Sequence, residues 1–168
     1  YGIGELATRR LIDDGCRRIL CLRSNSRMRM PANKRTDAYL DVVEQAGLSA
    51  LVREVEFVKP DDEKGAVVAK ILDENPDIDG IFAGDDTMAA ICLNVMKQRG
   101  LSAPDDIKVV GADGARRTMT FMPDLTTVRQ DIDRIGELAA QSIIALINGD
   151  NPESNIKLPV ELIEGKTA

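Results

Sequence analysis

The sequence predicts an α/β fold: a mostly parallel sheet flanked by helices on both faces. Two observations support this. Segments whose apolar residues recur at helical spacing alternate along the chain with short apolar segments. Several of the short segments are apolar almost throughout, as expected for parallel strands that are covered by helices on both sides.

The helices are predicted from apolar periodicity and from the residues that end each run. Gly15 ends the first run, Gly47 ends the second, and Pro76 lies beyond the end of the third. The predicted helices cover residues 3–14, 34–46, 62–75, 87–99 and 131–148.

The strands are predicted from short apolar runs between these helices. RILCL, GIFAG and KVVGA have few polar residues, which indicates strands in the middle of a sheet, whereas ALVREVEF alternates apolar and polar residues. The predicted strands cover residues 18–22, 50–57, 80–84, 108–112, 125–130 and 157–164.

The composition is typical of one globular domain and argues against several partners. The chain has 168 residues and a net charge of −6. Its only basic cluster, residues 23–29, is predicted to be a solvated loop. We therefore expect no nucleic-acid-binding face within this chain. No apolar run reaches the length of a membrane span, so no membrane partner is expected. Three cysteines without disulfide spacing favour a reducing cytoplasm.

The residue inventory also argues against catalysis. The chain has no histidine, which removes the commonest general base and the Ser-His and Cys-His nucleophile pairs. It lacks the G-x-G-x-x-G and G-x-x-x-x-G-K phosphate loops, and a zinc site would need dispersed thiols and carboxylates. We predict that the chain is not an enzyme and has no cofactor or metal. A weaker hypothesis is acid–base chemistry by Asp85 and Asp113.

Polar residues follow the predicted strands at the edge where ligands bind in open parallel sheets. Together with one aromatic ring, they are typical of a site for a polyhydroxylated or polar small molecule. The set comprises Arg23, Ser24, Asn25, Phe57, Asp85, Asp86, Asp113 and Gln130.

The adjacent acids Asp85 and Asp86 are predicted to have different roles. Asp86 directly precedes helix 87–99, where a carboxylate can cap free N–H groups for about 1 kcal/mol; we predict that it is the helix cap. Asp85 lies closer to the strand and is predicted to face a ligand. A magnesium site is the weaker alternative, because phospho-acceptor receiver domains place their acids after other strands and add a lysine.

Three further candidates each have a structural interpretation beside the functional one. Asp113 could begin a turn with Gly114, Phe57 could lie in the core, and Arg35 could be an ordinary exposed helix residue. In the functional interpretation, the Arg35 guanidinium holds two hydroxyls or a carboxylate, and Phe57 presents its ring to a sugar.

The order of several motifs resembles the LacI/GalR (lactose/galactose repressor) family of transcription regulators. GELATRRLIDDGCRRILCL, RTDAYLDVVEQAGL, GLSAPDDIKVVGADG and PDLTTVRQD are similar to the effector-binding core of that family, and the resemblance covers essentially the whole chain. It implies a periplasmic-binding-protein-like core with Rossmann-like three-layer lobes. In this family a sugar or other metabolite binds between two lobes, and an N-terminal helix-turn-helix binds an operator.

The resemblance assigns ligand contacts to five residues. The arginine of R-x-x-G-[FY] falls on Arg35, the asparagine of N-D-x-x-A on Asp85, and the aspartate of V-G-[FY]-D on Asp113. The strand-end aromatic falls on Phe57 and the glutamine of L-T-T-[VI]-x-Q on Gln130. An aspartate in place of asparagine only accepts hydrogen bonds, which favours hydroxyl or amine donors and disfavours anions.

The resemblance also implies how the chain is organised. Residues 1–168 would form the effector-binding and dimerisation region, largely its second lobe. Residues 125–150 would pack on a first lobe that is missing, and the N-terminal DNA-binding domain would be absent from this chain. The implied dimer surface combines helix 87–99 with the loop 114–123. Its expected apolar seam is Ala89, Ala90, Leu93 and Met96.

The leading hypothesis is therefore the effector-binding region of a cytoplasmic, homodimeric bacterial repressor. A small-molecule effector, expected to be a sugar, would modulate operator binding through the absent domain. The alternative is a periplasmic sugar-binding protein of a transport system, which shares the fold. The first residues of the full-length protein distinguish the two, because one begins with a helix-turn-helix and the other with an export signal.

Overall fold

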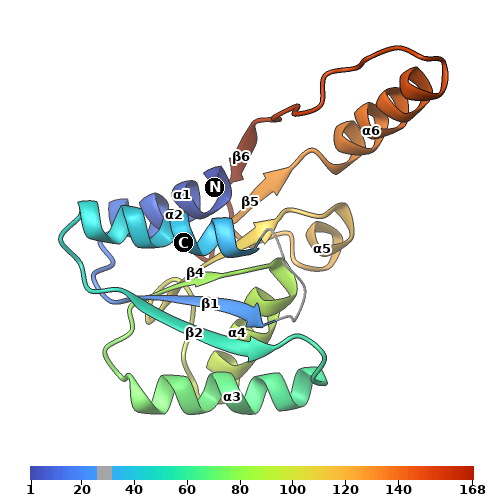
Figure 1. The fold of residues 1–168 in the computed structure, drawn as a ribbon. Helices are drawn as coiled ribbons and strands as arrows, with labels where there is room; N and C mark the ends of the chain where they lie inside the picture. Colours follow the sequence, from blue (N-terminus) through green and yellow to red (C-terminus); the bar gives the residue numbers. More distant parts are fainter. Residues whose placement is uncertain (26–31) are drawn as a thin grey trace.

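The computed structural model describes residues 1–25 and 32–168, and these form a six-stranded sheet with helices on both faces (Figure 1). The strands are β1 (Ile19–Asn25), β2 (Leu51–Glu56), β3 (Gly80–Ala83), β4 (Lys108–Asp113), β5 (Thr127–Gln130) and β6 (Val160–Ile163). The helices are α1 (Gly2–Asp13), α2 (Ala32–Gln45), α3 (Asp61–Glu74), α4 (Asp86–Gln98), α5 (Arg116–Phe121) and α6 (Ile132–Ile147).

The strand order is β2-β1-β3-β4-β5-β6. The first five strands in this order are parallel, and β6 is antiparallel to β5. The predicted α/β fold class is therefore confirmed. The carboxyl ends of the parallel strands meet at one edge of the sheet, which is the edge at which the sequence predicts a ligand site.

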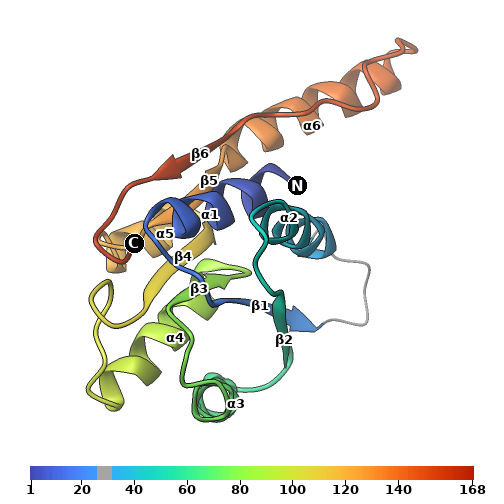
Figure 2. The ribbon, with the colours of Figure 1, turned by 90° about the vertical axis from the view of Figure 1, so that its left-hand side faces the viewer.

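Helices cover both faces of the part of the sheet formed by β1, β3 and β4 (Figure 2). Helices α1 and α2 pack on one face, around Phe82 and Tyr39, and α3 and α4 pack on the other. Along β1 the buried residues alternate between the two cores: Cys21 contacts the α1 and α2 side, while Leu20 and Leu22 contact the α3 and α4 side. This double burial explains why the first four residues of β1, residues 19–22, are all apolar.

Several predicted elements differ from the structure, among them β1, which extends to Asn25. The predicted loop 114–123 contains helix α5, which buries none of its residues and so left no apolar period in the sequence. The last strand covers Val160–Ile163 instead of residues 157–164. Most of the basic cluster at residues 23–29 lies outside the described residues, although Arg23 and Asn25 belong to β1.

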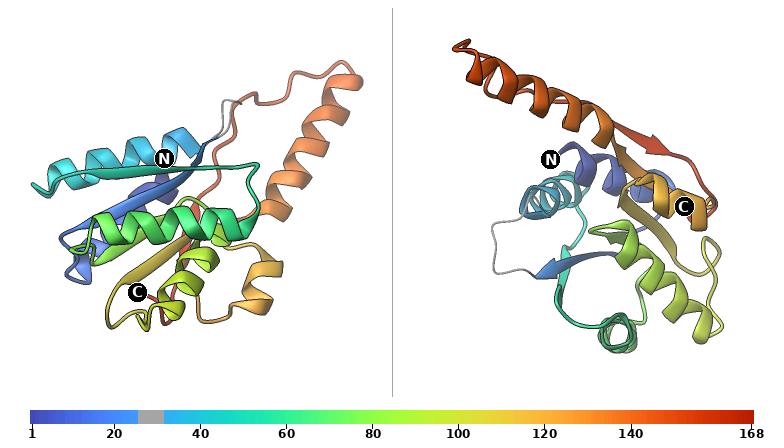
Figure 3. Two further views of the ribbon diagram at one scale, coloured as in Figure 1. Left: turned by 90° about the horizontal axis from the view of Figure 1, so that it is seen from below. Right: turned by 90° about the vertical axis from the view of Figure 1, so that its right-hand side faces the viewer.

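Helix α6 leaves the rest of the molecule and projects away from it, and the segment 148–159 returns along it (Figures 1 and 3). None of its residues is buried, and Ile135 and Ile143 are 44% and 58% exposed. Its apolar side chains and residues 151–160 enclose a cavity of about 660 Å³. Among the described residues, no helix is long and apolar enough to cross a membrane.

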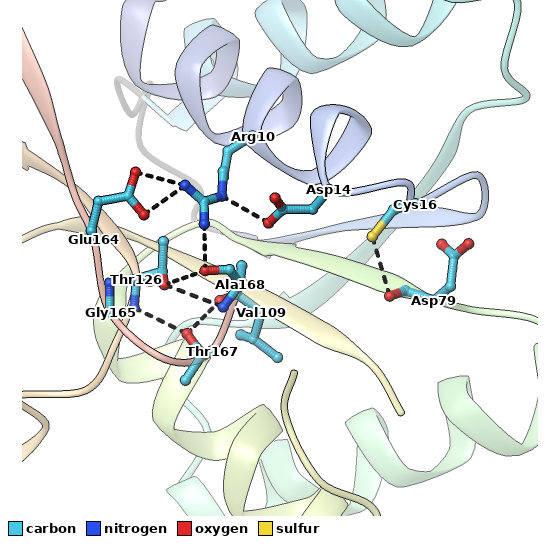
Figure 4. A network of polar contacts seen from close by, with 10 residues as sticks. All are labelled: Arg10, Asp14, Cys16, Asp79, Val109, Thr126, Glu164, Gly165, Thr167 and Ala168. Atoms are coloured by element: carbon cyan, nitrogen blue, oxygen red, sulfur yellow. Dashed lines mark hydrogen bonds and ion pairs between the residues drawn. The ribbon is translucent and has the colours of Figure 1, made fainter. Parts of the chain in front are cut away.

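A polar network ties the end of the chain to α1 and the sheet (Figure 4). The Arg10 guanidinium pairs with Glu164 at 2.6 Å and with Asp14 at 2.7 Å, and it donates to the Ala168 carbonyl at 2.9 Å. The Thr167 hydroxyl donates to the Val109 carbonyl at 2.6 Å. The segment after β6 is therefore fixed to the sheet, in contrast to α6.

Candidate functional site

A cavity of about 570 Å³ opens at the carboxyl ends of the parallel strands. It is lined by four of the five residues that the sequence predicts to contact a ligand: Arg35, Phe57, Asp85 and Asp113. The fifth, Gln130, reaches the cluster from β5 through Asp113. The remaining lining residues are Ser24, Lys64, Gly84, Thr87, Met88 and Ile91. The predicted site residues thus come together in space, although their binding role stays a prediction.

Arg35, Asp113 and Gln130 form one connected polar cluster. The Arg35 Nη2 atom lies 2.5 Å from Asp113 Oδ1, and its Nη1 atom donates to the Gly84 carbonyl. Gln130 Nε2 donates to the same Asp113 Oδ1 at 2.6 Å. Within the described part of the chain, Asp113 Oδ2 has no hydrogen-bond partner, so it can accept a hydrogen bond from a ligand hydroxyl.

Arg35 is held at the cavity by the close packing of α1 and α2. A Cβ atom on Gly4 would lie 2.1 Å from the Arg35 carbonyl oxygen, so only glycine lets α1 come this near the first turn of α2. One turn later, the buried Tyr39 hydroxyl donates to the Ile19 carbonyl at 2.7 Å and accepts from the Leu51 N–H at 2.8 Å. Helix α2 is therefore fixed to α1, β1 and β2, and Arg35 with it.

Asp113 combines a positive backbone φ with a place at the cavity. Its φ is 99°, and that of Gly114 is 58°, so two successive residues adopt the left-handed conformation. Aspartate tolerates this conformation better than most side chains. Asp113 is the last residue of β4, and its side chain lines the cavity.

The helix cap is Asp85, so the prediction that Asp86 caps α4 is wrong. Asp85 has the extended backbone of an N-cap residue (φ −154°, ψ 167°), and its Oδ1 accepts from the Met88 N–H at 2.8 Å. The helix begins one residue before the apolar pattern suggests. Asp85 therefore both caps the helix and lines the cavity.

Asp86 lies underneath the cavity instead. It is 3% exposed, and it accepts hydrogen bonds from the Thr127 hydroxyl at 2.6 Å and from the Ala115 N–H at 3.3 Å. Burial raises the pKa of its carboxyl above the ordinary value. A Cβ on Gly111 would lie 2.6 Å from Asp86 Oδ1, so a glycine is required beside it. Asp86 thus links α4 to β5 and to the turn after Asp113.

Phe57 and Lys64 form the α3 side of the cavity. Phe57 is 52% exposed, which fits a stacking surface and not the core position that was its alternative. The Lys64 ammonium lies 5.9 Å from the centre of the Phe57 ring and 3.2 Å from Asp61. Sequence reasoning missed Lys64, because a single lysine in an amphipathic helix looks like an ordinary surface residue.

The predicted dimer seam on α4 is only partly at the surface. Ala89 is fully buried and Met96 is 1% exposed, and both pack in the core between α4 and the sheet, so their assignment to a dimer surface is wrong. Ala90 and Leu93 are half-buried. The reason is that the apolar period of α4 marks the face turned toward its own sheet.

Known proteins with similar sequences define the class of this chain. A family model for the periplasmic binding protein-like domain matches residues 8–168. The sucrose operon repressor of Lactococcus lactis subsp. lactis is 33% identical over 162 residues, covering 96% of this chain and 49% of that protein. The ribose operon repressor of Halalkalibacterium halodurans is 31% identical, covering 97% and 49%. The chain therefore has a periplasmic binding protein-like domain over residues 8–168.

Solved structures agree with this class. The complex of the transcriptional regulator CelR with cellobiose matches at a TM-score of 0.88 and 29% identity, covering 99% of this chain and 51% of that one. A LacI-family regulator from Corynebacterium glutamicum matches at 0.85 and 26%, covering 98% and 62%. The chain belongs to the LacI/GalR family of transcription regulators, and it spans about half the length of the curated relatives it matches.

Proposed function

We propose that this chain is the effector-binding region of a bacterial transcription repressor whose effector is a sugar. The observation that carries the proposal is that Arg35 and Asp113, which form an ion pair, line one cavity with the exposed ring of Phe57, and that Gln130 is hydrogen-bonded to Asp113. The family membership supports it, as does the similarity to repressors of a sucrose operon and a ribose operon. A repressor that responds to a sugar requires no catalytic residues.

In this proposal, the cluster recognises neighbouring hydroxyls of the sugar. Arg35 donates hydrogen bonds to them, and the free Oδ2 of Asp113 accepts one. The exposed ring of Phe57 packs on the apolar C–H face of the sugar. Each contact matches the donor and acceptor chemistry of a polyol.

We further propose that the second wall of the site comes from another lobe, which packs on α6. The exposed apolar residues Ile135, Ile143 and Leu146 would contact that lobe. Gln130 is the last residue of β5, two residues before α6 begins. A sugar held by Asp113 and Gln130 would therefore bias the orientation of the lobes, and with it the operator affinity of a DNA-binding domain outside this chain.

The repressor would act in the cytoplasm as a homodimer. Support for the dimer comes from the family, and the surface available for it is smaller than the sequence suggested. Ala90 and Leu93 of α4 remain partly exposed, and Phe121 of α5 is 76% exposed. In this proposal, these three residues form the dimer contact in place of the predicted apolar seam.

The test is calorimetric titration of the full-length repressor with sucrose, ribose and cellobiose. We expect one of them to bind, and Arg35→Ala and Asp113→Asn to weaken its binding about 30-fold or more, because each removes a charge-assisted hydrogen bond. Arg99→Ala is the matched control, since it also breaks an arginine–aspartate pair (Arg99–Asp73, 2.7 Å) but lies outside the cavity. Unchanged affinity in both site variants would disprove the site.

A further inference from the structure

We propose that the cavity selects uncharged sugars over their phosphate esters, and that Asp85 is the residue responsible. This inference rests on the proposed function, because it names the class of sugar that the same cavity binds. It depends on how the charges of the cavity wall are paired and on the role of Asp85 as the cap of α4.

The two cations of the cavity wall are each paired with a carboxylate. Arg35 lies 2.5 Å from Asp113, and Lys64 lies 3.2 Å from Asp61. Asp85 also lines the cavity, but it has no ion pair within the part of the chain that the structure describes. The wall therefore presents one carboxylate that forms no ion pair with a described side chain.

Asp85 also occupies the position that would otherwise attract a phosphate. The first turn of a helix presents free N–H groups and a partial positive charge, which favour an anion. Here the chain's own carboxylate fills this position, since Asp85 Oδ1 accepts from the Met88 N–H at 2.8 Å. A phosphate entering the cavity would find this helix N-terminus already occupied and would be repelled by the Asp85 carboxylate. A neutral hydroxyl can instead donate to the second oxygen, Oδ2.

The opposing possibility is that Lys64 leaves Asp61 and binds a phosphate. The Asp61 side chain is 68% exposed, so this ion pair is weak. However, the Lys64 ammonium already lies over the Phe57 ring, and a phosphate there would share the cavity with Asp85. Attraction to Lys64 is then opposed by repulsion from Asp85 and by competition with Asp61.

The experiment is calorimetric titration of the full-length repressor with matched sugar pairs: ribose and ribose 5-phosphate, sucrose and sucrose 6-phosphate, and glucose and glucose 6-phosphate. We expect the neutral member of the binding pair to bind at least about tenfold more tightly, by like-charge repulsion in a partly dry cavity. Asp85→Asn should strengthen binding of the ester by about tenfold or more and change the neutral sugar by less than about threefold. Asparagine caps helices as well as aspartate, so the fold is retained.

The control variant is Asp105→Asn, which makes the same charge change at an exposed residue outside the cavity and should leave both affinities unchanged. An ester that binds wild type more tightly and is lost in Lys64→Gln would overturn the inference but not the proposed function. If Asp85→Asn weakened binding of the neutral sugar and of its ester equally, the inference would also be overturned, because Asp85 would then contact both ligands without distinguishing their charge. Failure of every sugar and ester to bind wild type would overturn the proposed function and this inference together.

Discussion

Helices α4 and α6 have similar apolar patterns but different surroundings. Helix α4 buries seven residues against the sheet, among them Met88, Cys92 and Met96, whereas α6 buries none. Both sequences place apolar residues every three or four positions, and in both the pattern correctly predicts a helix. An amphipathic pattern therefore shows that one face of a helix needs a packing partner, but it does not identify that partner. For α4 the partner is its own sheet; for α6 we propose a lobe outside this chain.

The largest expected difference is between truncating a side chain in the core of the sheet and truncating one on α6. Phe82 is fully buried at the centre of the sheet, so Phe82→Ala should lower the free energy of unfolding by about 3–5 kcal/mol. Leu146 on α6 is 60% exposed, so Leu146→Ala should change it by less than about 0.5 kcal/mol. Urea denaturation of the 1–168 chain, followed by circular dichroism, measures both. Equal losses of stability would contradict the proposed difference between the core of the sheet and α6. A loss for Leu146→Ala only in the full-length protein would support packing of α6 on another lobe.

Alanine substitutions at two helical glycines should have smaller effects on stability, and these effects should be opposite in direction. A Cβ on Gly4 would meet the Arg35 carbonyl oxygen at 2.1 Å, so Gly4→Ala should destabilise the chain by about 1–3 kcal/mol and displace Arg35. A Cβ on Gly136, within α6, meets nothing within 4 Å, so Gly136→Ala should stabilise the 1–168 chain by about 0.5–1 kcal/mol. Thermal unfolding of the two variants tests this. A loss of stability for Gly136→Ala would show that α6 is already packed.

The pH dependence of stability should have opposite signs for the buried Asp86 and the exposed Asp106. Burial raises the pKa of Asp86, so its contribution is fully present below the unfolded pKa of about 3.9 and is lost as pH rises through the higher folded value. The stability of wild type relative to Asp86→Asn should therefore fall as pH rises above about 4, by at most about 1.4 kcal/mol per pH unit. Hydrogen bonds from Ser102 lower the pKa of Asp106, so its contribution is instead lost as pH falls below the ordinary aspartate range. Urea denaturation between pH 3 and 7 distinguishes the two signs.

Most of the fold could be predicted from the sequence because it depends on local signals. Buried strands such as β3 are apolar throughout, and helix ends are marked by Gly15 and Gly47, which both adopt positive φ. Helix α5 escaped prediction because it buries nothing, so no apolar period marks it. Its exposed residues have the same composition as a loop.

The site could be predicted in part, for a related reason. Arg35 and Asp113 were found because strand and helix ends converge at one edge of a parallel sheet. The cap role of Asp85 and the burial of Asp86 were missed, because α4 begins one residue earlier than its apolar pattern suggests. Lys64 was missed because its place over Phe57 depends on how α3 packs beside β2, which no local pattern encodes.

The smallest expected effect concerns the ion pair between α5 and α6. Arg116 of α5 and Asp133 of α6 lie 3.0 Å apart, but their side chains are 91% and 80% exposed. Such pairs contribute little, so a double-mutant cycle with Arg116→Ala and Asp133→Ala in the 1–168 chain should give a coupling below about 0.5 kcal/mol. Urea denaturation in low and high salt provides the measurement. A coupling above about 1 kcal/mol that survives high salt would mean that α6 is held to α5 by its own contacts, because screening removes only the exposed charge attraction. The orientation of α6 would then be a property of this chain, and an added lobe would have to fit that orientation instead of setting it.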